Sequence, residues 1–207
     1  MKLKHLLFIL AAGVGTTAAF AQDDAQNAKK IRERVKELIT ERCSLCHGAR
    51  GDAASGTFPR LAAQHPAYIV KQLRDFRDGR RRGTAMNEMA KDLGEEEIAG
   101  LAVHFSTQKA GSRKSLDSDL VAVGSYIFNK GNEYSGVPAC ASCHGADGHG
   151  TIQLPRLAGQ HPSYLETQLV DFNKRDRTND NAIMHTIASK MTMLEIKAVT
   201  AYIGGLE

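Results

Sequence analysis

The chain has 207 residues, of which 42% are hydrophobic and 24% charged, and its formal net charge is +4. This ordinary composition excludes a disordered or fibrous protein, and the length allows one or two domains with cores of their own. Removing Lys2 and Lys4 from the 27 basic groups leaves 25 against 23 acidic groups, a balance that gives no indication of nucleic-acid binding.

The first residues have the pattern of a secretory signal peptide. Lys2 and Lys4 precede an apolar run, and Ala19-Phe20-Ala21 forms a small-x-small cleavage site. The apolar run is interrupted by glycines and is too short to span a bilayer. We therefore expect residues 1–21 to be a signal peptide that is removed after Ala21, which leaves the mature protein outside the cytoplasm.

Helical patterns follow in chain order. Apolar residues over 31–39 recur at helical spacing just before the first pair of cysteines. The dipeptide His65-Pro66 predicts the start of a second helix, because proline suits the first helical position, and Gly79 marks its end. A third helix is expected to begin near Gly94.

The second half of the chain repeats the first. The run PRLAAQHPAYIVKQLRDF from Pro59 matches PRLAGQHPSYLETQLVDF from Pro155, an offset of 96 residues (155 minus 59). A capping box, Thr192-x-x-Glu195, precedes the last helix. Because no strand pattern appears, the sequence predicts an all-α protein built from two small helical domains in tandem.

We place the two domains at residues 22–107 and 119–207. The segment between them, 108–118, is polar, lacks apolar periodicity and falls where the repeat restarts, so it is expected to be a linker. Domains of this size bury little apolar area by themselves. A large apolar cofactor in each domain would supply the missing core.

Two clusters of basic residues stand out from the otherwise balanced charge. They are Arg80-Arg81-Arg82 and the stretch from Lys109 to Lys114. We expect both to be solvated surface, and the alternative is a docking site for an acidic partner protein.

All four cysteines lie in two C-x-x-C-H motifs. The motifs are Cys43-x-x-Cys46-His47 and Cys140-x-x-Cys143-His144. In c-type haem attachment, two thiols at this spacing form thioethers with the haem vinyl groups, and the adjacent histidine reaches the iron. The sequence therefore predicts two covalently bound haem c groups, with His47 and His144 as iron ligands.

Three other interpretations of the cysteines explain less. A structural zinc site needs four ligands together, whereas the two pairs lie in separate domains, 97 residues apart (140 minus 43). A thioredoxin-like disulfide needs a βαβ unit, and no strands are predicted. Plain disulfides suit an exported protein but leave the two following histidines unexplained.

The second axial ligand of each iron is expected at matching places in both repeats. Two pairs of residues meet this condition, Met86 with Met184 and His65 with His161. The histidines precede prolines at predicted helix starts, where a turn or capping role explains them. We favour the methionines, in the loop before the last helix, because His/Met ligation is the usual cytochrome c arrangement.

Ligand identity then predicts the function. With both axial positions filled by protein, neither iron has a place for a small-molecule substrate, peroxide or oxygen, which leaves one-electron exchange. A thioether ligand favours iron(II), so both reduction potentials are expected to be high, as suits a respiratory carrier near an oxidase. The sequence thus predicts an electron carrier and not an enzyme.

These motifs resemble a known family. The pattern C-x-x-C-H-G, then P-x-L-A-G-Q-x-x-x-Y-x-x-x-Q-L-x-x-F, then a methionine and a final helix occurs twice, and it is similar to the dihaem cytochrome c4 family. The resemblance implies two cytochrome c-like domains related by approximate twofold symmetry, with haem propionates near each other at the interface, in the bacterial periplasm. It implies a quinol-oxidising complex and a terminal oxidase or other acceptor as partners, with loose membrane association in some members.

The resemblance also assigns individual residues. It implies that the backbone carbonyls of Pro59 and Pro155 orient the two iron-binding histidines. Tyr68 and Tyr164 are placed to reach propionates, although packing on the middle helix explains them equally well. Gly124 fits the helix crossing usual in such domains, but the helix that ends at Cys43 has no matching glycine.

Two other functions are compatible with the same architecture. One is a cytochrome subunit bound permanently to a dehydrogenase, such as a flavoprotein that handles sulfide. The other is a dihaem peroxidase or a thiosulfate-oxidising cytochrome, which needs one open or differently ligated iron. The paired methionines argue against the second of these.

Overall fold

The structure is a computed structural model that describes residues 15–112 and 117–207, with only the backbone for 15–23. The described residues form ten α-helices and one π-helix, and no β-strand occurs among them. The prediction of an all-α fold is therefore confirmed. Residues 1–14 of the predicted signal peptide lie outside the described part. Within that part, no helix is long and apolar enough to cross a membrane.

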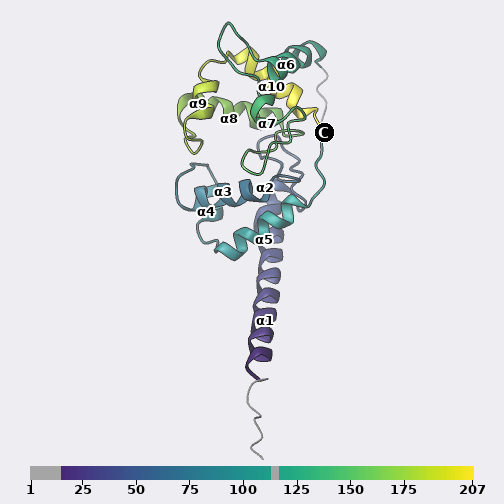
Figure 1. Cartoon of the computed structure of the whole chain (residues 1–207), viewed down its shortest axis with the longest axis vertical. Helices are drawn as coiled ribbons and strands as arrows, with labels where there is room; N and C mark the ends of the chain where they lie inside the picture. Colours follow the sequence, from purple (N-terminus) through teal and green to yellow (C-terminus); the bar gives the residue numbers. More distant parts are fainter. Residues whose placement is uncertain (1–14, 113–116) are drawn as a thin grey trace, which may run out of the picture.

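The two halves of the chain fold into similar sets of helices. The first half contains α1 (Gly15–Leu38), the π-helix η1 (Ile39–Cys43), α2 (Ser44–His47), α3 (Pro66–Arg77), α4 (Met86–Ala90) and α5 (Glu95–Ser106). The second half contains α6 (Ser118–Lys130), α7 (Ala141–His144), α8 (Pro162–Lys174), α9 (Ile183–Ala188) and α10 (Met193–Gly204). The halves are stacked along the long axis of the molecule, and α1 projects from the first of them (Figure 1).

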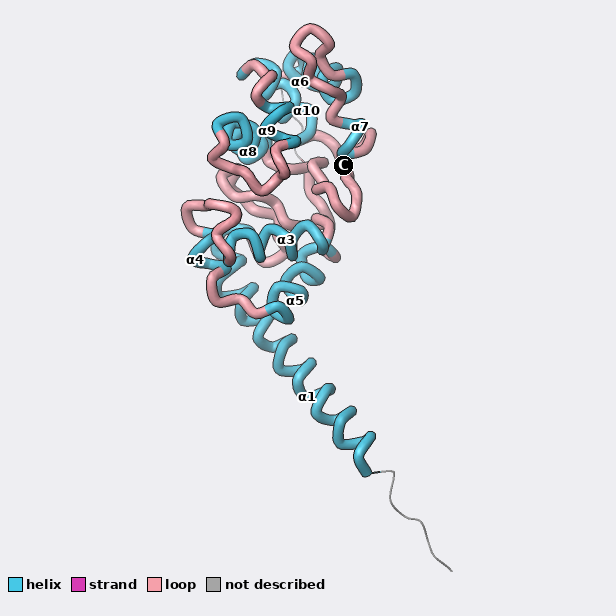
Figure 2. Tube along the Cα trace, turned by 60° about the vertical axis from the view of Figure 1, so that its left-hand side comes forward, coloured by secondary structure: helices cyan, strands magenta, loops and turns pink. Residues whose placement is uncertain are grey.

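Long loops gather between the two halves, with α3 and α8 beside them (Figure 2). Each half has its own apolar core, formed mainly by its first and last helices and its middle helix. The first core contains Val35, Leu38, Ile69, Phe76, Ile98, Leu101 and Phe105. The second contains Ile127, Phe128, Leu165, Ile196, Val199 and Ile203. Each half is therefore a domain with a core of its own.

The predicted helix boundaries are confirmed where a local signal marks them. Pro66 is the first residue of α3, and Gly79, just after this helix, has a φ of 73°, a left-handed conformation that favours glycine. The capping box of α10 forms, because Thr192 Oγ1 accepts from Glu195 N at 3.2 Å and the Glu195 carboxylate accepts from Thr192 N at 2.7 Å.

The loops predicted around the two methionines are partly helical. Met86 is the first residue of α4, and Met184 is the second residue of α9. Helices of five and six residues are too short to show apolar periodicity in the sequence, so the prediction of a loop was wrong at these places.

In the second domain, the first and last helices cross at a glycine. A Cβ atom at Gly124 on α6 would overlap the backbone carbonyl of Ala198 on α10. The absence of a side chain therefore lets the two backbones approach closely, and Phe128 packs beside the crossing, fully buried.

The first domain has the corresponding crossing, with the glycine on the other helix. Val35 on α1 faces Gly100 on α5, where a Cβ atom would lie only 2.6 Å from Val35 Cγ2. The sequence analysis looked for the glycine on the helix that ends at Cys43. The small residue of the pair lies instead on the partner helix, so the contact is kept.

Gly124→Ala tests the close crossing of α6 and α10. Helix propensity alone would stabilise this variant by about 1 kcal/mol, but the clash with the Ala198 carbonyl is expected to lower the free energy of unfolding by about 2 kcal/mol. Denaturant unfolding measured by circular dichroism gives the value. The neighbouring variant Ser125→Ala is expected to change stability by less than about 0.5 kcal/mol. An unchanged or raised stability of Gly124→Ala would contradict the crossing.

Candidate haem-binding sites

The two C-x-x-C-H motifs adopt the same local structure. His47 and His144 are the last residues of α2 and α7, and the glycines that follow them, Gly48 and Gly145, have φ of 75° and 81°. In this conformation a side chain would be strained. In the first domain the preceding turn is the π-helix η1, a wide helical turn of a kind often found at functional sites.

Both histidines are buried and held by a backbone carbonyl. His47 Nδ1 lies 2.9 Å from the Pro59 carbonyl oxygen, and His144 Nδ1 lies 3.2 Å from that of Pro155, as the family resemblance implies. Burial lowers the pKa of both rings, and the carbonyl contact opposes this only in part. A neutral ring that donates its Nδ1 proton to the carbonyl keeps the Nε2 lone pair free for a metal ion.

No disulfide joins any two of the four cysteines. Burial raises the pKa of Cys43, and it raises the pKa of Cys140 to about 11. Redox-active C-x-x-C pairs have thiols with lowered pKa values instead. No three His, Cys, Asp or Glu side chains in residues 24–112 and 117–207 are grouped to hold a metal ion, which also argues against a zinc site.

The two methionines lie on matching short helices. Met86 is half-buried and packs against the core of the first domain, and Met184 is half-buried on α9. Helix α4 packs on α3, and α9 packs on α8. The imidazole of His185, next to Met184, fixes α9 through a contact of 2.9 Å between its Nδ1 atom and the Phe172 carbonyl oxygen.

His65 and His161 belong to the interface between the domains. Each occupies the N-cap position of its helix, but neither makes the capping hydrogen bond expected from the sequence. His65 Nε2 lies instead 2.7 Å from the His149 carbonyl oxygen, and His161 Nε2 lies 2.7 Å from that of Ala53. The two histidines are 96 residues apart and bond to equivalent loops that follow the C-x-x-C-H motifs, so the two contacts are related by the repeat.

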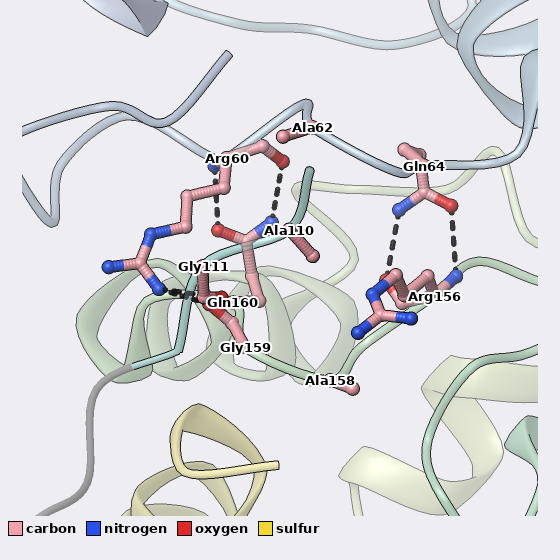
Figure 3. Close-up of a pocket in the computed structure, with 9 residues that line it drawn as sticks. All are labelled: Arg60, Ala62, Gln64, Ala110, Gly111, Arg156, Ala158, Gly159 and Gln160. Carbon is pink, nitrogen blue, oxygen red and sulfur yellow. Dashed lines mark hydrogen bonds between the residues drawn. The ribbon is translucent and has the colours of Figure 1, made fainter. Parts of the chain in front are cut away.

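Two glutamine side chains make a second reciprocal contact across the interface (Figure 3). The Gln160 amide accepts from Arg60 N at 2.8 Å and donates to the Arg60 carbonyl at 2.9 Å. The Gln64 amide makes the same pair of hydrogen bonds with Arg156, both at 2.9 Å. Each amide therefore satisfies the two backbone groups of one residue in the opposite domain.

A third reciprocal set contains two buried arginines. Arg81 donates to Tyr164 Oη at 3.0 Å and to Gln168 Oε1 at 2.7 Å in the other domain. Arg177 donates to Tyr68 Oη at 3.0 Å and to Gln72 Oε1 at 3.3 Å. Both arginines are only 7% exposed. The prediction of a solvated surface was therefore wrong for Arg81.

Carboxylates act on the two buried guanidinium groups only from a distance, as Asp171 does on both and Asp180 on Arg177. Arg81 and Arg177 each lie over a phenylalanine ring of their own domain, at 4.6 and 4.5 Å from the centroid. No carboxylate of the described part forms a salt bridge with either. Buried charges are normally paired, and a haem c carries two propionates. The residues present therefore fit an anionic, apolar cofactor in each domain.

The sequence analysis missed the role of these interface residues, although the repeat contained a signal for them. Identical polar residues recur at an offset of 96 in both halves, and the structure buries or half-buries them. They are Arg60 and Arg156, Gln64 and Gln160, Gln72 and Gln168, and Arg81 and Arg177. A repeated pair of polar residues with no role in the haem motif points to a twofold interface.

Comparison with known proteins gives one consistent result. A family model described as cytochrome c matches residues 121–207, and one described as cytochrome C oxidase, cbb3-type, subunit III matches residues 30–104. A cytochrome c4 of Pseudomonas aeruginosa is 40% identical over 168 residues, which cover 79% of this chain and 83% of that protein. The crystal structure of reduced recombinant cytochrome c4 from Pseudomonas stutzeri matches with a TM-score of 0.79 and 33% identity, over 87% of this chain and 98% of that one.

A further relative has a more specific name. A thiosulfate dehydrogenase electron acceptor of Stutzerimonas stutzeri is 35% identical over 198 residues, which cover 92% of this chain and 91% of that protein.

Replacing both interface glutamines tests the reciprocal contacts. Gln64→Ala combined with Gln160→Ala removes the four hydrogen bonds across the interface, each contributing about 1 kcal/mol, together with one bond from the following histidine N–H to each glutamine. It leaves backbone groups of the opposite domain without partners. Because each domain has its own core, we expect denaturant unfolding to separate into two transitions and the linker at 108–118 to be cleaved faster by protease. Ser106→Ala, which removes only a side-chain bond to the Val103 carbonyl within the first domain, is the control. A single unshifted transition in the double variant would contradict this role.

Proposed function

Since the chain belongs to the cytochrome c4 family of dihaem electron carriers, we propose that it passes single electrons between redox proteins of the periplasm through two haem sites closed by protein ligands. Two covalently bound haem c groups, one in each domain, follow from the family. When bound, these groups supply the one-electron chemistry. The residues of the chain hold them, exclude other ligands and link the two sites.

The observation that carries the proposal is the matched pair of buried histidines. His47 and His144 each have Nδ1 held by a proline carbonyl, which leaves Nε2 for iron. The four cysteines of the same motifs are the proposed attachment points. They are Cys43, Cys46, Cys140 and Cys143. The carbonyls of Pro59 and Pro155 fix the orientation of the two rings.

Met86 and Met184 are our proposed second axial ligands. The competing histidines, His65 and His161, already direct their Nε2 atoms at carbonyl oxygens of the opposite domain, which supports the methionines by elimination. A site with histidine and methionine on its two faces has no open position, so the protein is not expected to bind a small-molecule substrate or to catalyse its conversion.

Arg81 and Arg177 are proposed to bind the haem propionates at the interface. Each guanidinium is buried, donates to residues of both domains and lacks a carboxylate partner in the described part of the chain. Tyr68 and Tyr164 accept hydrogen bonds from these arginines and are expected to complete the propionate sites. This arrangement would bring the two cofactors near each other and so favour electron exchange between the domains.

The proposed partners are a quinol-oxidising complex as donor and a terminal oxidase as acceptor. A second candidate donor is a thiosulfate dehydrogenase, since a relative that aligns with 92% of this chain is named as the electron acceptor of that enzyme. Both candidates keep the role of electron carrier and differ in the protein that reduces it. The signal-peptide pattern at residues 1–21 supports the periplasmic location of either.

Met184→Ala tests the closed sites. Loss of the thioether is expected to remove half of the weak near-infrared band of methionine-ligated ferric haem and to let carbon monoxide bind one reduced haem. Met86→Ala should act in the same way on the other haem. Met191→Leu is the control, because Met191 is buried in the second core and matches Leu93 of the first repeat. If wild-type protein binds carbon monoxide or turns over peroxide, the proposal of a closed carrier fails.

Stopped-flow reduction distinguishes the two donors. Oxidised protein is mixed with a purified quinol-oxidising complex and quinol, or with a thiosulfate dehydrogenase and thiosulfate. We expect the first donor to reduce both haems at least tenfold faster at equal concentration. Reduction by the dehydrogenase alone would select the second candidate, and stable co-elution with it would favour a permanent subunit over a free carrier.

A further inference from the structure

The twofold relation between the domains is broken at one pair of aspartates. Asp75 on α3 and Asp171 on α8 occupy equivalent positions, 96 residues apart. The Asp75 carboxylate is almost fully buried and accepts from Lys71 Nζ at 2.5 Å and from Arg80 Nε at 2.7 Å. It also accepts from Asn179 Nδ2, across the interface, at 2.7 Å.

Asp171 has lost all three of these donors. The positions that correspond to Lys71, Arg80 and Asn179 hold Thr167, Asp176 and Gly83. Within the described residues the Asp171 carboxylate accepts no hydrogen bond, and only the backbone oxygen of this residue is bonded, to Asp176 N at 2.9 Å and Arg177 N at 3.1 Å. At the position of the donor Arg80, the second repeat has the carboxylate of Asp176.

The charges that face the two aspartates act in opposite senses. Burial and the Asp176 carboxylate raise the pKa of Asp171, against the attraction of Arg177 from the following loop, Arg81 from the other domain and Lys174 on α8. For Asp75, burial also raises the pKa, but the hydrogen bonds from its three donors outweigh it, so the pKa is lowered.

The two arginines that attract Asp171 are those that we assign to the propionates. Propionates bound at these guanidinium groups would partly cancel the positive charge that attracts Asp171. Cofactor binding would therefore raise the pKa of the Asp171 carboxyl further. Asp75 keeps its hydrogen-bond donors when the cofactors bind, because Lys71, Arg80 and Asn179 are not among the residues that we assign to the propionates.

We propose that Asp171 is a proton-binding site linked to reduction of the second domain. Asp171 binds one proton from water as one electron from the donor protein reduces iron(III) to iron(II) in this domain, and it releases the proton when the electron leaves. The carboxylate becomes a neutral carboxylic acid, so the added negative charge is balanced locally. This inference rests on the proposed electron-carrier function.

Electrostatics gives the link. A domain of about 90 residues has a radius of gyration of roughly 12 Å, so the Asp171 carboxyl lies close to the haem of its domain. Solvent screens the interaction between partly buried charges only weakly, so a change of charge at the haem acts on this carboxyl. Reduction adds negative charge and raises the affinity of Asp171 for a proton. By reciprocity, the reduction potential of the second domain must fall as pH rises through the titration of Asp171. The ionised Asp75 gives the first domain no such dependence.

Spectroelectrochemical titration of the holoprotein tests the proposal between about pH 4.5 and pH 8. We expect one of the two potentials to fall with rising pH and the other to stay level. Asp171→Asn should abolish the slope, and so should Thr167→Lys combined with Asp176→Arg, which gives Asp171 two of the donors of Asp75 and keeps it ionised. Asp75→Asn is the matched control and should keep the slope. Met184→His identifies the potential of the second domain, because loss of a methionine ligand lowers it.

An infrared difference spectrum between oxidised and reduced protein gives a second measurement. A carboxyl C=O band that appears on reduction and is missing in Asp171→Asn supports the proposal. A slope that persists in Asp171→Asn would assign the proton to another group, such as a propionate, and two level potentials in the wild type would overturn the link altogether. Failure of the carrier function itself is distinct, because the wild type would then bind carbon monoxide or fail to be reduced reversibly.

Discussion

Two positive charges buried at one interface constrain the rest of this structure. Arg81 and Arg177 are held by neutral tyrosine and glutamine oxygens of both domains and lie over phenylalanine rings of their own cores. A buried guanidinium without a salt bridge is costly, so the propionates that we propose to bind there would stabilise both arginines. On that proposal, haem attachment would stabilise the association of the domains as well as the core of each.

The features that the sequence predicted well are those with a local signal. The C-x-x-C-H motifs, the proline at the start of α3 and the capping box of α10 each depend on a few adjacent residues. Arg81 was misjudged because three consecutive arginines resemble solvated surface, and the residues that bury it, Tyr164 and Gln168, lie more than 80 positions away. The crossing in the first domain was missed for a similar reason, since Gly100 lies on the helix opposite to the one that was searched.

Duplication explains why the interface is reciprocal. Once two copies of one domain pack about a twofold axis, every polar residue at the interface acts twice, as Gln64 and Gln160 do. A single substitution in the ancestral repeat would then create two hydrogen-bonded pairs. In a symmetric dimer, too, each interface residue makes its contact twice. The same effect accounts for the recurrence of interface polar residues at one offset.

The same reciprocity makes the two haem environments alike wherever it holds. A difference between them that originates at the interface must come from positions where the repeats diverge. One such divergence surrounds a pair of carboxylates, because Lys71, Arg80 and Asn179 contact Asp75 and have no equivalents beside Asp171. A fused pair of domains can vary such positions independently, which a homodimer cannot do. Covalent duplication thus allows the surroundings of the two haem sites to differ in charge while the reciprocal contacts between the domains stay the same.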